Sequence, residues 1–288
     1  MKRLALHAPG ALEYFAALVA EDKGFALLEA AITLAQDEHP MLDAQGVLQQ
    51  IDLLAARLKK RLPADASPMQ RLRALSLYFF RELGFAGNLN DYYDRRNSYV
   101  HEVVAARRGI PITLALIFNE LATQIGLTAH GVSFPGHFLI KLRMPQGEVV
   151  IDPFNGRSLS RDELDERLVP FRRRHGLEGE FETPLGLFVQ AAPARDVLAR
   201  MLRNLKEIHR TCEDWPRLLA VQQRLVLLLP GAAEEVRDRG LTFGELGRAE
   251  DAAADLDAYL ALRPDAHDAP ALAARACELR GSGTPKLH

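Results

Sequence analysis

The sequence predicts an α+β protein in two parts: a helix-rich domain that contains a small antiparallel sheet, followed by an all-α region of helical repeats. Apolar residues recur at helical spacing before about residue 83 and again after residue 194. Between them, three short segments at about 128–134, 137–143 and 148–152 have the composition of strands. We place the domain boundary near residue 190, so that the expected domains are 1–190 and 191–288.

Composition excludes several classes of protein. The chain has 288 residues, 48% of them hydrophobic, and its net charge of −2 predicts no nucleic-acid partner. No apolar run reaches the roughly 18 residues of a membrane-spanning helix, and the N-terminal apolar stretch is too short for a signal peptide. Cys212 and Cys277 lack CxxC spacing, so we expect neither a disulfide framework nor a zinc site. These features predict a cytoplasmic globular protein with no membrane partner and no implied cofactor.

The N-terminal part is expected to be helical. Residues 10–62 carry apolar side chains at helical spacing, and Pro63 ends this stretch. The next helix begins at Ser67 and Pro68, with Ser67 as the N-cap and Pro68 at the first helical position, where proline is favoured. We expect this helix to end near residue 84.

The central part is expected to hold two further helices before the strands. A short one runs over about 99–106, and a second begins at Pro111 and ends near Gly126. The second is apolar on nearly every side, which is typical of a buried helix. After the strands we expect a charged helix at 160–176 and a loop at 178–192.

The C-terminal region repeats. Pro230 and Pro264 are 34 residues apart, and so are Leu225 and Tyr259. This period is that of tetratricopeptide repeats, in which pairs of helices stack because neither pair buries its apolar face alone. The concave side of such a stack either binds a segment of another protein or packs on the protein's own first domain, and both alternatives stay open. The expected helices are 194–210, 214–229, 232–246, 249–262 and 266–280.

His137 and Asp152 are the first candidate site residues. A hairpin folded about residues 144–145 pairs 137 with 152, 139 with 150 and 141 with 148, which places the two side chains on one face. A carboxylate there can accept the imidazole Nδ1–H bond and fix the tautomer, as the base and its orienting group do in a catalytic triad. The alternative is a structural His–Asp hydrogen bond without catalysis.

Four motifs in the middle of the chain are long enough to be specific: NSY at 97–99, RGIPITL at 108–114, GVSFPGHF at 131–138 and IDPFNG at 151–156. They are accompanied by RDRGL at 237–241 and DLDAYL at 255–260. Together these motifs resemble the transglutaminase-like (papain-like) core of the SirB-type proteins, which carry tetratricopeptide repeats behind that core. The resemblance covers most of residues 65–280.

The resemblance implies a site without its nucleophile. Active transglutaminase-like enzymes have Gly-x-Cys before the core helix, followed by a strand-borne His and Asp. In this sequence Gly109 takes the glycine place, Pro111 the cysteine place, and His137 and Asp152 the places of the catalytic pair. Because proline cannot act as a nucleophile, the resemblance argues against acyl transfer by a thiol.

Two substitutes for the missing chemistry are considered. Thr113 could carry a hydroxyl near His137, although threonine is a weak nucleophile without a strong base and more often bonds to backbone near a helix start. A metal held by His101, His137 and Asp152 would lack a helix-borne ligand pair, so we expect no metal.

Asn97 and Arg108 are candidate binding residues, because basic and amide side chains beside a helix start can line an anion pocket. The alternative is that Arg108 ties its loop to Asp94 or Asp91.

Three hypotheses of function follow. The first is a non-catalytic binding or scaffold protein that engages a protein partner through its repeats or through the vestigial groove. The second is a hydrolase-type enzyme that uses His137 as general base on water, with Asp152 orienting it. The third is a purely structural His137–Asp152 pair beneath a filled groove.

Overall fold

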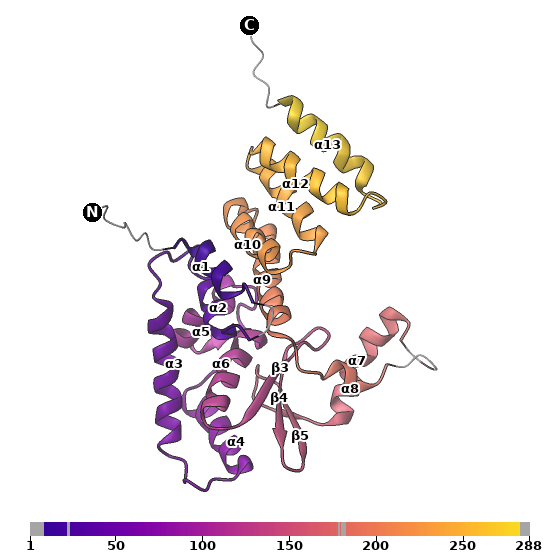
Figure 1. Ribbon diagram of the computed structural model, residues 1–288. Coiled ribbons are helices and arrows are strands. Elements are labelled where there is room, and N and C mark those ends of the chain that lie inside the picture. Colours follow the sequence, from indigo (N-terminus) through magenta and orange to yellow (C-terminus); the bar gives the residue numbers. More distant parts are fainter. Residues whose placement is uncertain (1–8, 22–23, 178, 180–182, 283–288) are drawn as a thin grey trace, which may run out of the picture. The chain divides into compact units, whose positions relative to one another are not determined.

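The computed structural model describes residues 9–21, 24–177, 179 and 183–282, and these form two compact units (Figure 1). The sheet unit comprises residues 26–35 and 41–201. The repeat unit comprises the described residues among 1–25, 36–40 and 202–288. This division differs from the expected domains 1–190 and 191–288, because two N-terminal segments group with the C-terminal helices and the division falls inside a helix.

The helices of the sheet unit follow the sequence expectations closely. Ser67 caps its helix as expected, since its Oγ accepts from the Gln70 N–H at 3.3 Å while the Gln70 side chain accepts from the Ser67 N–H. That helix continues as a π-helical turn, η1 (Leu77–Glu82). The α-helices are α2 (Leu27–Thr33), α3 (Ala44–Lys59), α4 (Pro68–Ser76), α5 (Val100–Ala106), α6 (Pro111–Gln124), α7 (Arg161–His175) and α8 (Leu185–Phe188).

The sheet has four antiparallel strands in the order β3-β4-β5-β6. They are β3 (Thr128–Val132), β4 (Leu139–Met144), β5 (Gly147–Ile151) and β6 (Ser158–Leu159). A separate two-residue parallel pairing joins β1 (Ala86–Gly87) to β2 (Arg108–Gly109). Neither this pairing nor β6 is expected from the sequence, because pairs of two residues leave no periodic signal.

The helix α6 is the centre of the sheet unit. Ten of its residues are buried, as expected for a helix that is apolar on nearly every side. It packs on β3 and β4, and α3, α4 and α5 also contact it (Figure 1). The helix is therefore held from several sides, and two residues considered for the candidate site, Pro111 and Thr113, lie in its first turn.

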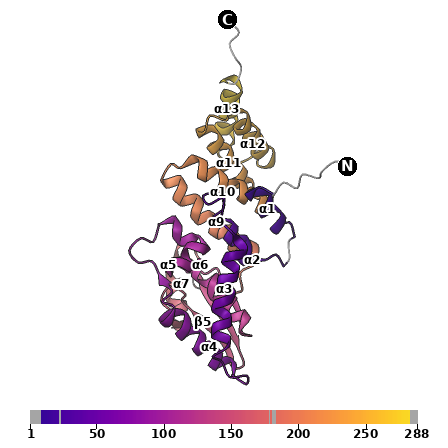
Figure 2. The ribbon, with the colours of Figure 1, turned by 90° about the vertical axis from the view of Figure 1, so that its left-hand side faces the viewer.

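The repeat unit is a stack of helices in which consecutive members of the stack contact one another (Figure 1 and Figure 2). The helix α1 (Ala11–Leu18) packs on α10 (Trp215–Leu228), and the stack continues through α11 (Ala233–Glu245), α12 (Ala249–Leu262) and α13 (Ala269–Ser282). The helix α9 (Ala194–Thr211) contains the division between the units. The α+β class with a helical repeat region is confirmed.

One ion pair explains why the N-terminal segments belong to the repeat unit. The Arg224 side chain is 1% exposed and donates from Nε and Nη2 to the two carboxylate oxygens of Asp37, at 2.8 and 2.9 Å. Its guanidinium also lies over the Phe15 ring, 4.9 Å from the centroid. A buried guanidinium requires such a partner, and here the partner lies 187 residues away in the sequence.

The loop expected at 178–192 contains a short helix. Part of the expected loop 178–192 lies outside the described residues, and within the described part residues 185–188 form α8.

Among the helices that the structure describes, none combines the length and the apolar character that crossing a membrane requires.

Candidate functional site

The approach to α6 is shaped by two glycines. Arg107 ends α5 in the left-handed region, with φ of 60°, and Pro111 occupies the first turn of α6. A Cβ on Gly109 would lie 2.9 Å from both methyl carbons of Val103, so the close approach of α5 requires glycine. A Cβ on Gly87 would collide with the Phe154 ring at 2.1 Å, so this glycine admits Phe154 from the turn that follows β5.

His137 lies in a turn just before β4 rather than within a strand. Its backbone N–H donates to the Phe134 carbonyl at 3.1 Å, and Gly136 between them has φ of 70°, which favours glycine. Asp152 lies directly after β5, in a turn that its own carbonyl closes with the Gly156 N–H at 2.8 Å. Both side chains therefore project from the ends of the hairpin strands.

The structure brings His137 and Asp152 together, with Nε2 and Oδ1 2.8 Å apart. The expected register is wrong by two positions, because β4 and β5 pair Ile140 with Ile151 and Lys141 with Val150. The two-residue turn of the hairpin lies at 145–146, one residue further along the chain than the expected 144–145. A shift of two positions leaves every side chain on the same face of its strand. Both faces of β4 are buried, because Leu139 and Ile140, which point to opposite faces, are each 0% exposed.

Asp152 is the most constrained group of the site. It is 3% exposed, its Oδ1 also accepts from the Phe154 N–H at 3.0 Å, and its Oδ2 accepts from Arg167 on α7 at 3.3 Å. Burial by itself raises the pKa of Asp152, but the hydrogen bond and charge of His137, the Phe154 N–H and Arg167 outweigh it, so the pKa is lowered overall. Asp152 is therefore ionised at neutral pH.

The ionised carboxylate decides the tautomer of His137. An ionised carboxylate can only accept, so Nε2 of the imidazole must carry the hydrogen of the 2.8 Å bond. In the neutral ring Nδ1 is then the acceptor, with no hydrogen-bond partner among the described residues. The expected Nδ1–H bond to Asp152 is wrong for this geometry. With 24% of its side chain exposed, His137 can present Nδ1 to a ligand.

The residues at and beside the place expected for the nucleophile, Pro111 and Thr113, are both buried. Pro111 is buried at the start of α6. Thr113 is 0% exposed, and its Oγ1 has no hydrogen-bond partner among the described residues, so its hydroxyl cannot meet a substrate without rearrangement. The Ser133 Oγ accepts from Arg200 at 2.8 Å.

Asn97 and Arg108 line one cleft of about 210 Å³, together with Asn88, Asp94, Arg96, Glu102 and Ala106. Asn97 is 3% exposed, and its amide is occupied by the Asp91 and Tyr92 carbonyls, at 2.7 and 3.2 Å. Arg108 donates to the Gly84 and Arg107 carbonyls, at 2.5 and 2.9 Å, rather than to the expected Asp94 or Asp91. The amide of Asn97 thus secures the loop, and a binding role for both residues stays a prediction.

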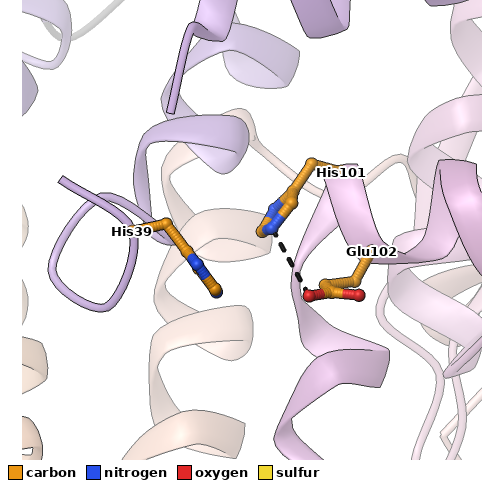
Figure 3. Close-up of side chains that lie close together, drawn as sticks. All are labelled: His39, His101 and Glu102. Carbon is orange, nitrogen blue, oxygen red and sulfur yellow. Dashed lines mark ion pairs between the residues drawn. The ribbon is translucent and has the colours of Figure 1, made fainter. Parts of the chain in front are cut away.

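The metal alternative finds no support in the geometry. Among the described residues, His101, His137 and Asp152 do not bring their ligand atoms within 4.8 Å of one another. His101 on α5 instead lies beside Glu102, with Nε2 and Oε1 3.7 Å apart (Figure 3). His39, also drawn there, belongs to the repeat unit.

Sequence reasoning misses Arg167 and Arg200. Arg167 lies in the charged run of α7, 15 residues beyond Asp152, and Arg200 lies 67 residues beyond Ser133. Arginines are frequent in both helices, so nothing in the sequence marks these two as the ones that reach the site.

Comparison with known proteins agrees with this architecture. A family model described as "Transglutaminase-like superfamily" matches residues 45–203, and a tetratricopeptide-repeat model matches residues 205–276. The chain therefore belongs to the transglutaminase-like superfamily. No solved structure matches it.

Among the similar sequences, a UPF0162 protein of Xylella fastidiosa is 37% identical over 249 residues, covering 86% of this chain and 88% of that protein. A UPF0162 protein of Pseudomonas aeruginosa is 30% identical over 263 residues, covering 91% and 94%. The human F-box only protein 21 is 40% identical over 72 residues, covering 25% of this chain and 12% of that protein. The UPF0162 relatives confirm the expected SirB-type resemblance, and the two kinds of domain suggest a scaffold or binding role.

Proposed function

We propose that this protein is a non-catalytic member of its superfamily, which engages a protein partner through its repeats or through the groove beside His137. The observation that carries the proposal is the combination of a buried Pro111 in the nucleophile place with an intact His137–Asp152 hydrogen bond. Asp152 also accepts from Arg167 and from the Phe154 N–H, so the pair is held in place although proline occupies the nucleophile place.

The enclosure of Thr113 supports the same proposal, because its hydroxyl cannot meet a substrate. What remains accessible is the Nδ1 side of His137, which can accept a hydrogen bond from a bound backbone or side chain. These features favour recognition over covalent catalysis.

The repeat unit supports partner binding independently. Its helices are braced by ion pairs between neighbours, such as Lys206 on α9 with Glu235 and Asp238 on α11. Half-exposed leucines remain on the stack at Leu227, Leu241 and Leu262. Stacked helical repeats of this kind provide extended surfaces that generally bind other proteins.

The test is affinity capture by the intact protein, by His137→Ala and by a triple variant. The triple variant combines Leu227→Glu, Leu241→Glu and Leu262→Glu. Removing the repeats outright is unsuitable, because it would strip Arg224 from Asp37 and Phe15. A partner lost only in the triple variant assigns binding to the repeats. A partner lost only in His137→Ala assigns it to the groove, provided that both variants melt cooperatively. Capture of no specific partner would overturn the proposal.

One observation favours a second candidate, a hydrolase with His137 as general base. Asp152 is ionised and Nδ1 of His137 has no described partner, which is the protonation pattern of a base that activates water. The test is turnover of 4-nitrophenyl acetate by the intact protein, His137→Ala and Asp152→Asn. Equal rates for all three exclude this role for that ester, while loss in both variants at unchanged folding would support it.

A further inference from the structure

Arg200, near the start of α9, is a half-buried cation that the proposed function does not yet use. Its Nη1 donates to Ser133 Oγ at 2.8 Å and to the Phe134 carbonyl at 3.3 Å, and its guanidinium lies over the Phe138 ring, 5.6 Å from the centroid. These contacts hold the guanidinium against the turn that carries His137.

The charge of Arg200 is not neutralised by any carboxylate among the described residues. Burial lowers its pKa, and only the Tyr92 hydroxyl acts in the opposite direction. The two buried arginines have carboxylate partners, Asp37 for Arg224 and Asp165 for Arg172. Arg107 is half-buried, like Arg200, and also has no carboxylate partner among the described residues. An uncompensated cation in a partly desolvated position is costly, and an anionic ligand would offset that cost.

The Arg200 side chain and the His137 backbone share one hydrogen-bond acceptor, the Phe134 carbonyl. The Phe134 carbonyl accepts from the His137 backbone N–H at 3.1 Å and from Arg200 at 3.3 Å. A group bound at the guanidinium therefore lies close to the backbone of His137.

An aromatic loop borders the same place. The Tyr92 ring lies 6.2 Å from the Phe154 ring, and the Phe154 N–H donates to Asp152. Tyr92 is 44% exposed, and its neighbours Leu89 and Tyr93 are 83% and 79% exposed. Asn97 fixes this loop through the Tyr92 carbonyl. Exposed aromatic and aliphatic side chains on a secured loop are typical of a binding surface.

We propose that Arg200 and Tyr92 form a carboxylate subsite beside His137, and that the occupant is a peptide segment in which an apolar or aromatic residue adjoins an acidic group. The proposal rests on the proposed binding function of the groove. Guanidinium and phenol donate to the carboxylate, and the Leu89–Tyr93 loop covers the apolar neighbour. The carboxylate belongs either to an acidic side chain or to the free C-terminus of the bound peptide.

The test uses three matched peptides: acetyl-Phe-Glu-amide, acetyl-Phe-Gln with a free carboxylate, and acetyl-Phe-Gln-amide. Binding to the full-length protein is followed through the NMR resonances of the His137 ring. We expect at least one charged peptide to bind about tenfold or more tightly than the neutral one, and the preferred charged peptide identifies the source of the carboxylate.

Variants of the protein test whether Arg200 causes the preference for charged peptides. Arg200→Gln should abolish the preference for charge, Arg200→Lys should keep part of it, and Arg143→Gln, which changes an exposed arginine on β4, should leave it unchanged. Because the comparison of charged with neutral peptides uses the unmodified protein, it stands even if Arg200→Gln fails to fold.

Failure of this inference is distinguishable from failure of the proposed function. Equal binding of all three peptides at the His137 ring would overturn the carboxylate subsite while leaving a groove that binds peptides. No perturbation of the His137 ring by any peptide would also overturn the subsite, and the capture experiment would then decide whether the repeats alone bind a partner.

Discussion

Asp152→Asn removes one negative charge from the centre of the site while keeping the size of the side chain. The carboxylate is 3% exposed and accepts from His137, the Phe154 N–H and Arg167, at 2.8, 3.0 and 3.3 Å. An amide oxygen can still accept from His137 and Phe154, but without charge assistance, and its NH₂ group would meet the donor of Arg167.

The expected loss is moderate. Hydrogen bonds to charged groups contribute about 1.5–3 kcal/mol each, against about 0.5–1.5 kcal/mol for neutral ones. The side chains of His137 and Arg167 are 24% and 37% exposed, so solvent screens both and neither is left deeply buried without a partner. We therefore expect Asp152→Asn to lower the free energy of unfolding by about 1–2 kcal/mol at pH 7.

The loss should depend on pH in a defined direction. The folded pKa of Asp152 is lowered, so its ionised form contributes stability above the unfolded value of about 3.9, and this contribution disappears as the pH falls through the folded pKa. The difference in the free energy of unfolding between the intact protein and Asp152→Asn should therefore be largest near pH 7 and become smaller in acid.

Urea unfolding of both proteins between pH 7 and the acid limit of folding measures this difference. Asp65→Asn serves as the control, because Asp65 is exposed and its change should cost little at any pH. A difference that stays constant down to the lowest pH, or that grows in acid, would refute the reasoning that Asp152 is held ionised by its partners.

Three further predictions concern other parts of the protein. Thr113→Val should stabilise the protein by about 1 kcal/mol in urea unfolding, because it removes a buried hydroxyl without a described partner; a destabilised variant would contradict this. Arg224→Met should cost about 2–4 kcal/mol by the same measurement, because it leaves Asp37 without its two donors; an unchanged midpoint would show that the pair is dispensable. Burial raises the pKa of Tyr92 while Arg200 lowers it, so Arg200→Gln should raise that pKa further in ultraviolet absorbance titrations referenced to Tyr92→Phe; a fall would contradict the placement of Arg200.

The sequence by itself determines most of the helices and the family. Ser67 with Pro68, and Pro111 at the start of α6, mark helix starts by chemistry that is local to a few residues, and the structure begins helices at both places. The helical repeats are readable because a 34-residue interval recurs in the sequence.

Only the tertiary structure decides how distant groups meet. The register of β4 against β5 differs from the expectation by two positions, because it depends on the turn at 145–146, and both registers satisfy the same alternation. His137 and Asp152 still meet, but from turns outside the strand ladder, and this selects Nε2 rather than Nδ1 as the bonded nitrogen.

The unit boundaries and the partners of the site arginines also depend on contacts between residues that are far apart in the sequence. Asp37 and Arg224 are 187 positions apart, and Arg200 is 67 positions from Ser133. Charged residues are frequent in this sequence, so which arginine is buried against which acceptor has no local signature. Local sequence sets backbone propensity and the face that each element buries, whereas the partners of buried charges follow from packing between elements far apart in the sequence, which only the folded structure specifies.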